Sequence, residues 1–144
     1  MAISFIENLL KRNLSLTKSD RWRENMTNNK SDELLAEWVD RLGLQNWVIS
    51  LHPCCKPDEM TEPESTGCTT WNETIRTARI EILDQQYYGD DIIIPFDWEK
   101  TLVHELLHIK TCFISSECEP LQERLAHQLI DDLARAFVDV KEGR

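Results

Sequence analysis

The heptapeptide Leu-Val-His-Glu-Leu-Leu-His, residues 102–108, places the strongest constraint on how this chain can fold. It sets His104, Glu105 and His108 among apolar residues that recur with the period of a helix with a buried face. Residues four apart lie above one another on a helix, so both imidazoles point to one place. Burying polar side chains is costly unless they find partners, and a metal ion would be such a partner. The segment therefore predicts a partly buried, metal-binding helix.

Local signals on both sides of this motif indicate two helices. Asp97 is a capping type of residue directly before the apolar pattern, so we expect a helix over residues 97–112. After a short loop, Pro120 suits the first turn of a second helix. That second helix carries an apolar stripe that we expect to face the core: Leu121, Leu125, Leu129, Leu133, Phe137 and Val140.

The N-terminal half predicts one helix followed by a strand. Residues 31–43 combine Ser31 as a cap with an apolar face, and they end at Gly43, a residue type that commonly ends helices. The β-branched and apolar residues 47–51 are typical of a strand. Proline and cysteine between residues 52 and 70 indicate a loop.

Two further segments have strand character. Residues 74–83 alternate apolar and polar side chains, which predicts a strand with one face on the core and with Arg79 and Glu81 toward water. The apolar run within residues 87–96 predicts a shorter strand. It must end at Pro95, because proline cannot donate a hydrogen bond to a sheet.

The order helix, strands, helix, helix indicates an α+β fold. We expect a small mixed or antiparallel sheet, a backing helix over residues 31–43, the motif-bearing helix and a C-terminal helix. At 144 residues the chain suits a single domain. We assign that domain to residues 31–144, and residues 1–30 to a short helix at 3–10 followed by a polar arm with few apolar side chains.

Composition excludes several classes of partner. The formal net charge is −10 at pH 7, and the basic residues are scattered, whereas nucleic-acid backbones are bound by clustered Lys and Arg. No apolar run approaches the roughly 20 residues that cross a membrane. The N-terminus lacks the basic start and cleavage site of a secretory signal, so we expect a cytoplasmic protein. Nothing in the sequence fixes an oligomeric state.

Five cysteines are present, and their odd number fits reduced thiols better than a disulfide framework. Cys54, Cys55 and Cys68 share one predicted loop with His52, so a small metal clip competes there with ordinary loop thiols. The vicinal Cys54 and Cys55 lack the Cys-x-x-Cys spacing of zinc sites, and we favour ordinary thiols.

Zn²⁺ is the metal that the motif favours. Neutral imidazole is a good zinc ligand, and tetrahedral zinc with three protein ligands keeps one position for a water whose pKa falls to about 7. Glu105 is rotated by about 100° from His104, so it can reach that water without binding the metal. The competing interpretation is a solvated or hydrogen-bonded polar group with no metal. Cys112 lies four residues after His108, and we predict a simple helix-end thiol.

The segment His104-Glu105-Leu106-Leu107-His108 resembles the HExxH signature of the zincin metallopeptidases. Over about residues 31–140 the order of elements also resembles small zincin-like metallopeptidase proteins of bacteria and their phages. The resemblance implies that His104 and His108 bind zinc, and that Glu105 is the general base and proton shuttle of peptide-bond hydrolysis. It also implies that a peptide or protein substrate adds as a further strand to an antiparallel edge strand, formed by residues 74–83 or by the run after them.

The same resemblance offers two candidates for the third zinc ligand. In the gluzincin branch of the zincins, a Glu ligand lies about twenty residues after the second His, and an Asp four residues later orients the first His. His127 lies nineteen residues after His108, and Asp131 follows it by four. This spacing favours His127 as ligand, in place of the family's Glu, and Asp131 as the partner of His104. The alternative is Glu123 as ligand, with His127 in the orienting role.

Together these features predict a zinc-dependent metallopeptidase with a minimal zincin-like fold. Tyr87 and Tyr88 could donate a hydrogen bond to the developing oxyanion, although packing against the sheet is the favoured role. The alternative function is a non-catalytic metal-binding or interaction module. Glu105 favours the enzyme, because a closed structural zinc site has no use for a carboxylate beside an open position.

Overall fold

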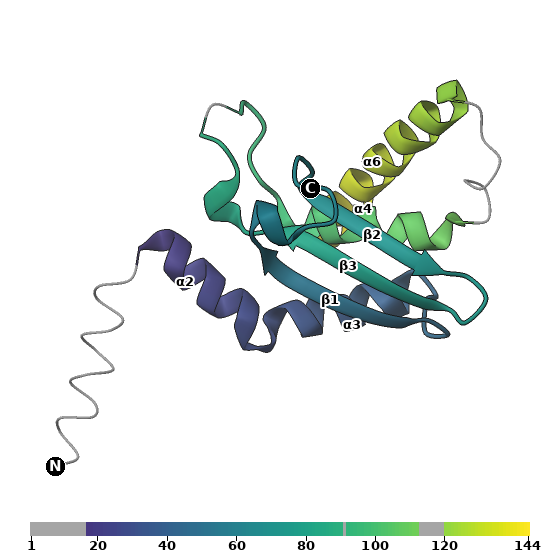
Figure 1. The fold of residues 1–144 in the computed structure, drawn as a ribbon, viewed down its shortest axis with the longest axis horizontal. Coiled ribbons are helices and arrows are strands. Elements are labelled where there is room, and N and C mark those ends of the chain that lie inside the picture. The colour runs from purple at the N-terminus through teal and green to yellow at the C-terminus, as the bar shows by residue number, and fades with distance from the viewer. Residues whose placement is uncertain (1–16, 91, 113–119) are drawn as a thin grey trace, which may run out of the picture.

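The chain folds into a small mixed sheet with helices packed on one of its faces (Figure 1). The computed structural model describes residues 17–90, 92–112 and 120–144. The helices are α2 (Lys18–Asn25), α3 (Ser31–Arg41), α4 (Trp98–Lys110) and α6 (Pro120–Glu142), and the strands are β1 (Val48–Cys55), β2 (Gly67–Asn72) and β3 (Thr77–Leu83). The predicted α+β class is confirmed, and the helix predicted at 3–10 lies outside the described residues.

The sheet has the strand order β1-β3-β2, with β1 parallel and β2 antiparallel to the central strand. The strand predicted at 47–51 is confirmed in its central part, and it continues to Cys55. The loop predicted over 52–70 was wrong at both ends, because β2 already begins at Gly67. The sequence of β2, GCTTWN, has no run of apolar side chains. Its main-chain pairing with β3 holds it in the sheet. The side-chain pattern of β2 alone does not predict that pairing.

β3 is the buried centre of the sheet. Ile80 and Ile82 have no exposed surface, as their alternation predicts. Glu81 was predicted to face water but is buried, because its carboxylate accepts a hydrogen bond from the Thr61 main chain at 2.7 Å and pairs with Arg79 at 2.8 Å. Since β3 has a neighbour on each side, the antiparallel edge strand is β2, and the expectation that residues 74–83 form that edge was wrong.

Residues 87–90 and 92–96 contain no strand where one was predicted, since the chain forms a 3-10 turn at Gln85–Tyr87 and then a loop in these described residues. The Tyr88 hydroxyl donates to the main-chain oxygen of Ile94 at 2.7 Å, which closes the segment on itself. Three isoleucines of this loop are exposed instead of pairing in a sheet: Ile92 by 50%, Ile93 by 98% and Ile94 by 63%.

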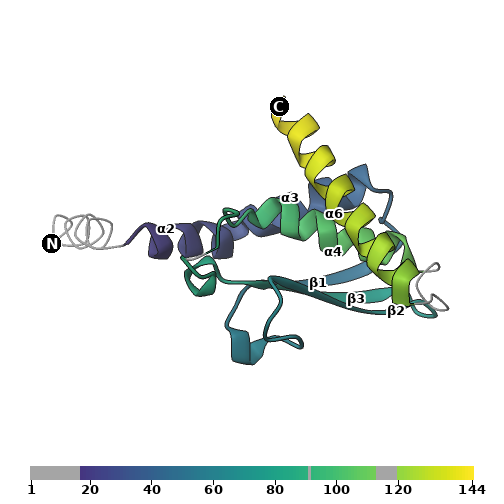
Figure 2. The same cartoon turned by 90° about the horizontal axis from the view of Figure 1, so that it is seen from above.

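α4 forms the layer next to the sheet and contacts β2, β3, α3 and α6. Figure 2 shows it lying between the strands and α6. Asp97 caps the helix as predicted, because its side chain accepts a hydrogen bond from the Lys100 main chain at 3.0 Å. Leu102, Val103 and Leu106 have no exposed surface. The helix that carries the motif is therefore fixed by packing on both sides.

α6 begins at Pro120 as predicted but buries a different face from the one expected. Its buried residues are Ile130, Ala134 and Val138, among which Ala134 is small enough to allow close approach to α4. The predicted inward stripe was wrong for most of its members, because the helix has a second apolar face that the described residues leave uncovered. The exposed members are Leu121, Leu125, Leu129, Phe137 and Val140.

The N-terminal arm is more ordered than its polar sequence predicts. α2 continues through a π-helical segment, Met26–Lys30, into α3, so Ser31 lies inside helical backbone and is not a cap. Arg23 pairs at 2.8 Å with the carboxylate of Asp84, whose side chain is fully buried, and Met26 belongs to the main core. The helix end predicted at Gly43 is confirmed by its left-handed backbone, with φ of +66°.

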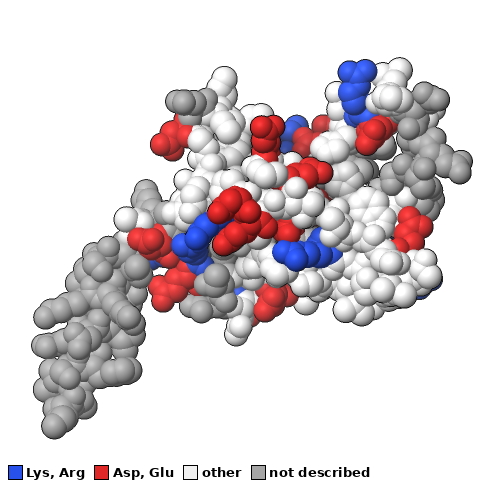
Figure 3. All heavy atoms as spheres, in the orientation of Figure 1, with Lys and Arg blue, Asp and Glu red and all other residues white. Residues whose placement is uncertain are grey.

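Charged side chains of both signs are scattered over the surface seen in Figure 3. On the face shown in Figure 3, basic side chains lie beside acidic ones instead of forming a continuous patch. Among residues 17–90, 92–112 and 120–144, no helix is both long enough and apolar enough to span a membrane.

The buried face of α4 and the exposed apolar face of α6 should respond differently to the loss of a leucine side chain. Leu102→Ala removes a fully buried side chain from α4 and should lower the free energy of unfolding by about 2–5 kcal/mol. Leu125→Ala, the same change at a side chain of α6 that is 55% exposed, should change it by less than about 0.5 kcal/mol. Urea denaturation measures both, and equal losses would contradict the packing of α6.

Candidate metal centre

Three imidazoles from two helices converge on one point. On α4, the Nε2 atoms of His104 and His108 lie 3.1 Å apart. From α6, the ring of His127 approaches them with centroid distances of 4.7 Å to His104 and 5.1 Å to His108. One ligand nitrogen from each residue lies within 4.8 Å of the other two. The packing of α6 on α4 thus brings together residues nineteen or more positions apart in sequence.

The donor set suits a tetrahedral zinc ion. Zinc–imidazole bonds of about 2.0–2.1 Å place two ligand nitrogens roughly 3.3 Å apart in a tetrahedral site, close to the separation of His104 and His108. Three His ligands leave the fourth position free for water or substrate. Within the part of the chain that the structure describes, these three residues are the group of potential ligands that comes this close together.

Burial keeps two of the imidazoles in the form that binds metal. Removal from water, together with the neighbouring His108 and His127, lowers the pKa of His104 to about 4, although Asp131 opposes this. Burial and the neighbouring His127 lower the pKa of His108 as well. Both rings are therefore uncharged near neutral pH, and a neutral imidazole is the ligand form.

Asp131 connects the metal site to the surrounding charges. One of its oxygens lies 3.4 Å from Nδ1 of His104, on the side of the ring away from His108. The same carboxylate pairs with Lys100 at 3.0 Å and with Arg135 at 3.3 Å. A carboxylate behind a ligand His fixes the orientation of the ring, which is the role predicted for Asp131.

Glu105 lies in the contact between α4 and the edge strand β2. Only 6% of the residue is exposed, and its carboxylate accepts a hydrogen bond from the Thr69 hydroxyl at 2.6 Å. Burial raises the pKa of Glu105 to about 7, and the bond from Thr69 offsets part of that rise. Glu105 lines a cavity of about 350 Å³ together with His104 and His127. Glu105 thus lines the same space as two of the three imidazoles.

Gly67 makes room for this carboxylate. A Cβ atom at position 67 would lie 2.5 Å from Oε1 of Glu105 and 2.9 Å from the Thr101 methyl carbon, closer than atoms can pack. Neither Gly67 nor Thr69 was identified from the sequence, because both belong to the segment expected to be a loop or its end. The only local features that could have pointed to them are the lack of a side chain at Gly67 and the hydroxyl group of Thr69.

The remaining predicted residues lie outside this group. Glu123, the alternative third ligand, is exposed one helical turn before His127 and is not part of the convergent set. Tyr88 packs against Phe96 with ring centroids 5.2 Å apart, which fits the packing role favoured for it, and Tyr87 is 43% exposed. Cys112 is buried and is not among the converging ligands.

The cysteine segment has no metal clip among the described residues. His52 lies 3.4 Å from the Ser50 hydroxyl. Burial raises the pKa of Cys54 and of Cys68 to about 11, so both are protonated thiols at neutral pH, whereas metals bind thiolates. Cys118 lies outside the described residues.

Gly67→Ala tests the close contact between β2 and α4. Because the added methyl group must displace Glu105 or Thr101, we expect a loss of about 1–3 kcal/mol in the free energy of unfolding. Gly89→Ala is the matched control, since its nearest neighbour would be Ile92 at 3.9 Å and its effect should stay within about 0.5 kcal/mol. A fully stable Gly67→Ala protein would contradict this contact.

Without metal, the buried histidines should make stability depend on pH. An unfolded chain binds protons at His104 and His108 below a pKa of 6.5, whereas folded His104 resists protonation to about 4. Stability from these groups is complete above pH 6.5 and is lost as the pH falls toward 4, because the unfolded state binds more protons. Glu105 has the opposite linkage, since its folded pKa is raised, so the test uses Glu105→Gln protein.

Chelator-treated Glu105→Gln protein should therefore lose stability in urea between about pH 7.5 and about pH 5. His104 should account for roughly 1–2 kcal/mol of this loss. Adding His104→Asn should remove that share. The same pH dependence with and without His104 would show that the ring is not held uncharged by burial.

Comparison with protein-family models, with curated proteins and with solved structures found no match for this chain. The chemistry of the site must therefore be inferred from its own residues, their burial and their geometry.

Proposed function

We propose that this protein is a zinc-dependent metallopeptidase with a minimal zincin-like fold. The observation that carries the proposal is the convergence of His104, His108 and His127 around one point, with Glu105 lining a cavity that His104 and His127 also line. A closed structural site would need a fourth protein ligand, and the described residues offer three. The spacing of the HExxH motif supports the same assignment.

Each polar residue of the site has a role in this proposal. His104, His108 and His127 would hold zinc, which would supply a Lewis acid for the scissile carbonyl and for the attacking water. Glu105 accepts a proton from the attacking water as its oxygen bonds to the carbonyl carbon, and it then gives that proton to the amine nitrogen as the C–N bond breaks. Asp131 holds the His104 ring in place, and Thr69 holds Glu105.

The edge of the sheet offers a place for the substrate. β2 is an edge strand that contacts α4, and its residue Thr69 touches Glu105. A peptide that adds to this edge in extended form would gain main-chain hydrogen bonds and would pass beside the metal site. Substrate strand addition is therefore assigned to β2, in place of the segment 74–83.

A non-catalytic interaction module is the second candidate. The observation that favours it is the exposed apolar face of α6, which includes Leu121, Leu125 and Leu129 and could receive a partner. The metal would then be structural or absent. The two functions differ in whether Glu105 has a chemical role.

Metal content tests the ligand set. Wild-type protein purified without added metal should contain about one zinc per chain, and His127→Ala should lose most of it. Glu123→Gln is the matched control, because this residue lies one turn away on α6, is exposed and should leave zinc unchanged. If Glu123→Gln lost its zinc and His127→Ala kept it, the third ligand would be Glu123 and not His127.

Hydrolysis of a fluorogenic peptide library tests the proton shuttle. Glu105→Gln should keep its zinc and lose about 10²–10⁴-fold in rate, because a Gln side chain cannot accept the proton. Glu123→Gln should retain the wild-type rate. A zinc-loaded wild-type protein that cleaves none of the library would favour the interaction module instead.

A further inference from the structure

The carboxylate of Asp131 is shared by side chains from both helices of the metal site. Its Oδ1 atom lies 3.0 Å from Nζ of Lys100 and 3.4 Å from Nδ1 of His104. Its Oδ2 atom lies 3.3 Å from a guanidinium nitrogen of Arg135. Lys100 and His104 belong to α4, whereas Asp131 and Arg135 belong to α6. The carboxylate is therefore contacted from its own helix and from the helix opposite.

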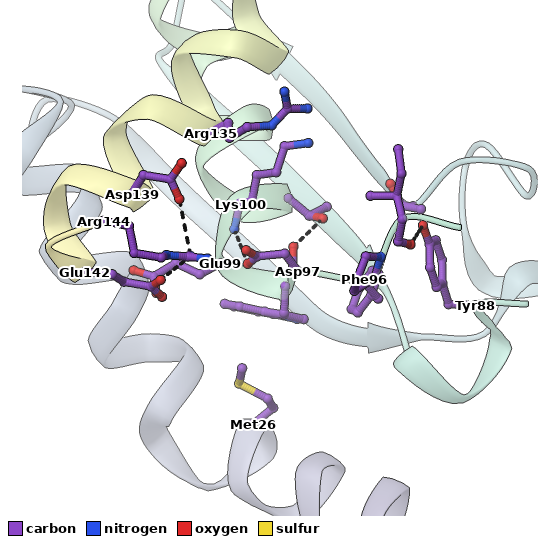
Figure 4. A pocket seen from close by; sticks show the side chains of 15 residues that line it. Met26, Tyr88, Phe96, Asp97, Glu99, Lys100, Arg135, Asp139, Glu142 and Arg144 are labelled. Atoms are coloured by element: carbon purple, nitrogen blue, oxygen red, sulfur yellow. Dashed lines mark hydrogen bonds and ion pairs between the residues drawn. The ribbon is translucent and has the colours of Figure 1, made fainter. Parts of the chain in front are cut away.

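Lys100 lies on the same face of α4 as His104. The two residues are four apart, so their side chains lie one helical turn from each other. Both line the cavity of the metal site together with Asp131. Figure 4 shows the Lys100 side chain extending from α4 on the side where Arg135 of α6 lies. The Lys100 side chain is 22% exposed and that of Arg135 is 54% exposed, so Lys100 is the more enclosed of the two cations on Asp131.

The contact between Asp131 and His104 is sensitive to small displacements. Its length of 3.4 Å is close to the limit at which an N–H group and an oxygen still form a hydrogen bond. Arg135 follows Asp131 by four residues on α6 and is mostly exposed, so on its own it would draw the carboxylate toward α6 and solvent. Lys100 acts in the opposite direction, because it holds Oδ1 from the side of α4.

We propose that Lys100 is a positioning residue of the metal site, which keeps the carboxylate of Asp131 behind the His104 ring. The inference rests on the proposed function, because it concerns the same three imidazole ligands. The Nε2 atom of His104 lies 3.1 Å from that of His108, so Nδ1 is the ring nitrogen that donates to Asp131. Lys100 acts through Asp131 and does not bind the metal itself.

Two effects of Lys100 on zinc binding have opposite signs. A cation that lines the cavity repels Zn²⁺, so removal of its charge alone would tighten binding. Loss of the carboxylate behind a ligand His weakens metal binding by about 10- to 100-fold. The repulsion is small, because Lys100 is paired with Asp131 at 3.0 Å. We therefore expect the positioning effect to be the larger one.

Lys100→Met and Arg135→Met form a matched pair for the test. Each removes one cation from Asp131, but only Lys100 contacts the oxygen that faces His104. Competition with a chelator of known affinity measures zinc binding. Lys100→Met should bind zinc about 10-fold more weakly or worse, and Lys100→Arg should recover most of the affinity. Arg135→Met should stay within about threefold of the wild type, because an exposed ion pair contributes little.

The ring of His104 gives a second readout, by NMR of the zinc-loaded protein. In the wild type its Nδ1 proton should be protected from exchange with water by the hydrogen bond to Asp131. Lys100→Met should lose this protection while the resonances of His108 and His127 keep their positions. If Lys100 only tied α4 to α6, its loss would shift all three rings and lower the urea midpoint of the metal-free protein, which we expect to be unchanged.

A double substitution tests whether Lys100 acts through Asp131. Adding Lys100→Met to Asp131→Asn protein should cost no further zinc affinity. A further loss there, tighter zinc binding by Lys100→Met, or equal losses in Lys100→Met and Arg135→Met would overturn the positioning role and leave the metal site standing. A wild type that binds no zinc would overturn the metal site and this role with it, so the two failures are distinguishable.

Discussion

The packing of α6 across α4 is the contact on which the candidate site depends. Ala134, Ile130 and Val138 form its buried core, and they set His127 opposite the two imidazoles of α4. At the far end of α6, Lys141 pairs with Glu37 of α3 at 2.9 Å and with Glu99 of α4. Ion pairs therefore hold one end of the helix and a metal would hold the other. A shift of α6 by one turn would separate the three imidazoles.

The site also buries ionisable side chains in a small core, which lowers the stability of the fold. Glu105 is almost fully buried and has a raised pKa, and burial holds His104 uncharged. Polar groups in such places oppose folding unless hydrogen bonds or a ligand compensate for lost water. Thr69 provides one such bond to Glu105, and Asp131 lies behind His104. Zinc binding would provide the remaining compensation, so folding and metal binding should be coupled.

Local pattern predicted the parts of the fold whose periodicity is strong. The cap at Asp97, the start of α6 at Pro120 and the central strand β3 follow from residue type and spacing, although β3 begins at Thr77 and residues 74–76, predicted to start it, form a turn that leaves Ile75 exposed. The sequence pattern did not predict the parts of the fold that depend on tertiary contacts. β2 has no apolar alternation and exists through pairing with β3, and α6 has two apolar faces, of which sequence alone cannot say which meets α4. The metal ligands were accessible to prediction because helical spacing brings two of them together. Thr69 and Gly67 were not, because their contact with Glu105 spans 36 and 38 residues.

The central claim is an open zinc site with three imidazole ligands, and zinc X-ray absorption spectroscopy of the metal-loaded protein tests it most directly. The account predicts four nitrogen or oxygen scatterers at about 2.0–2.1 Å, with the outer-shell signature of three imidazoles, and the loss of one imidazole or of zinc in His127→Ala. A sulfur scatterer at about 2.3 Å would contradict the set of three imidazole ligands, and a signature of four protein ligands would contradict the open position, because it would mean a closed structural site.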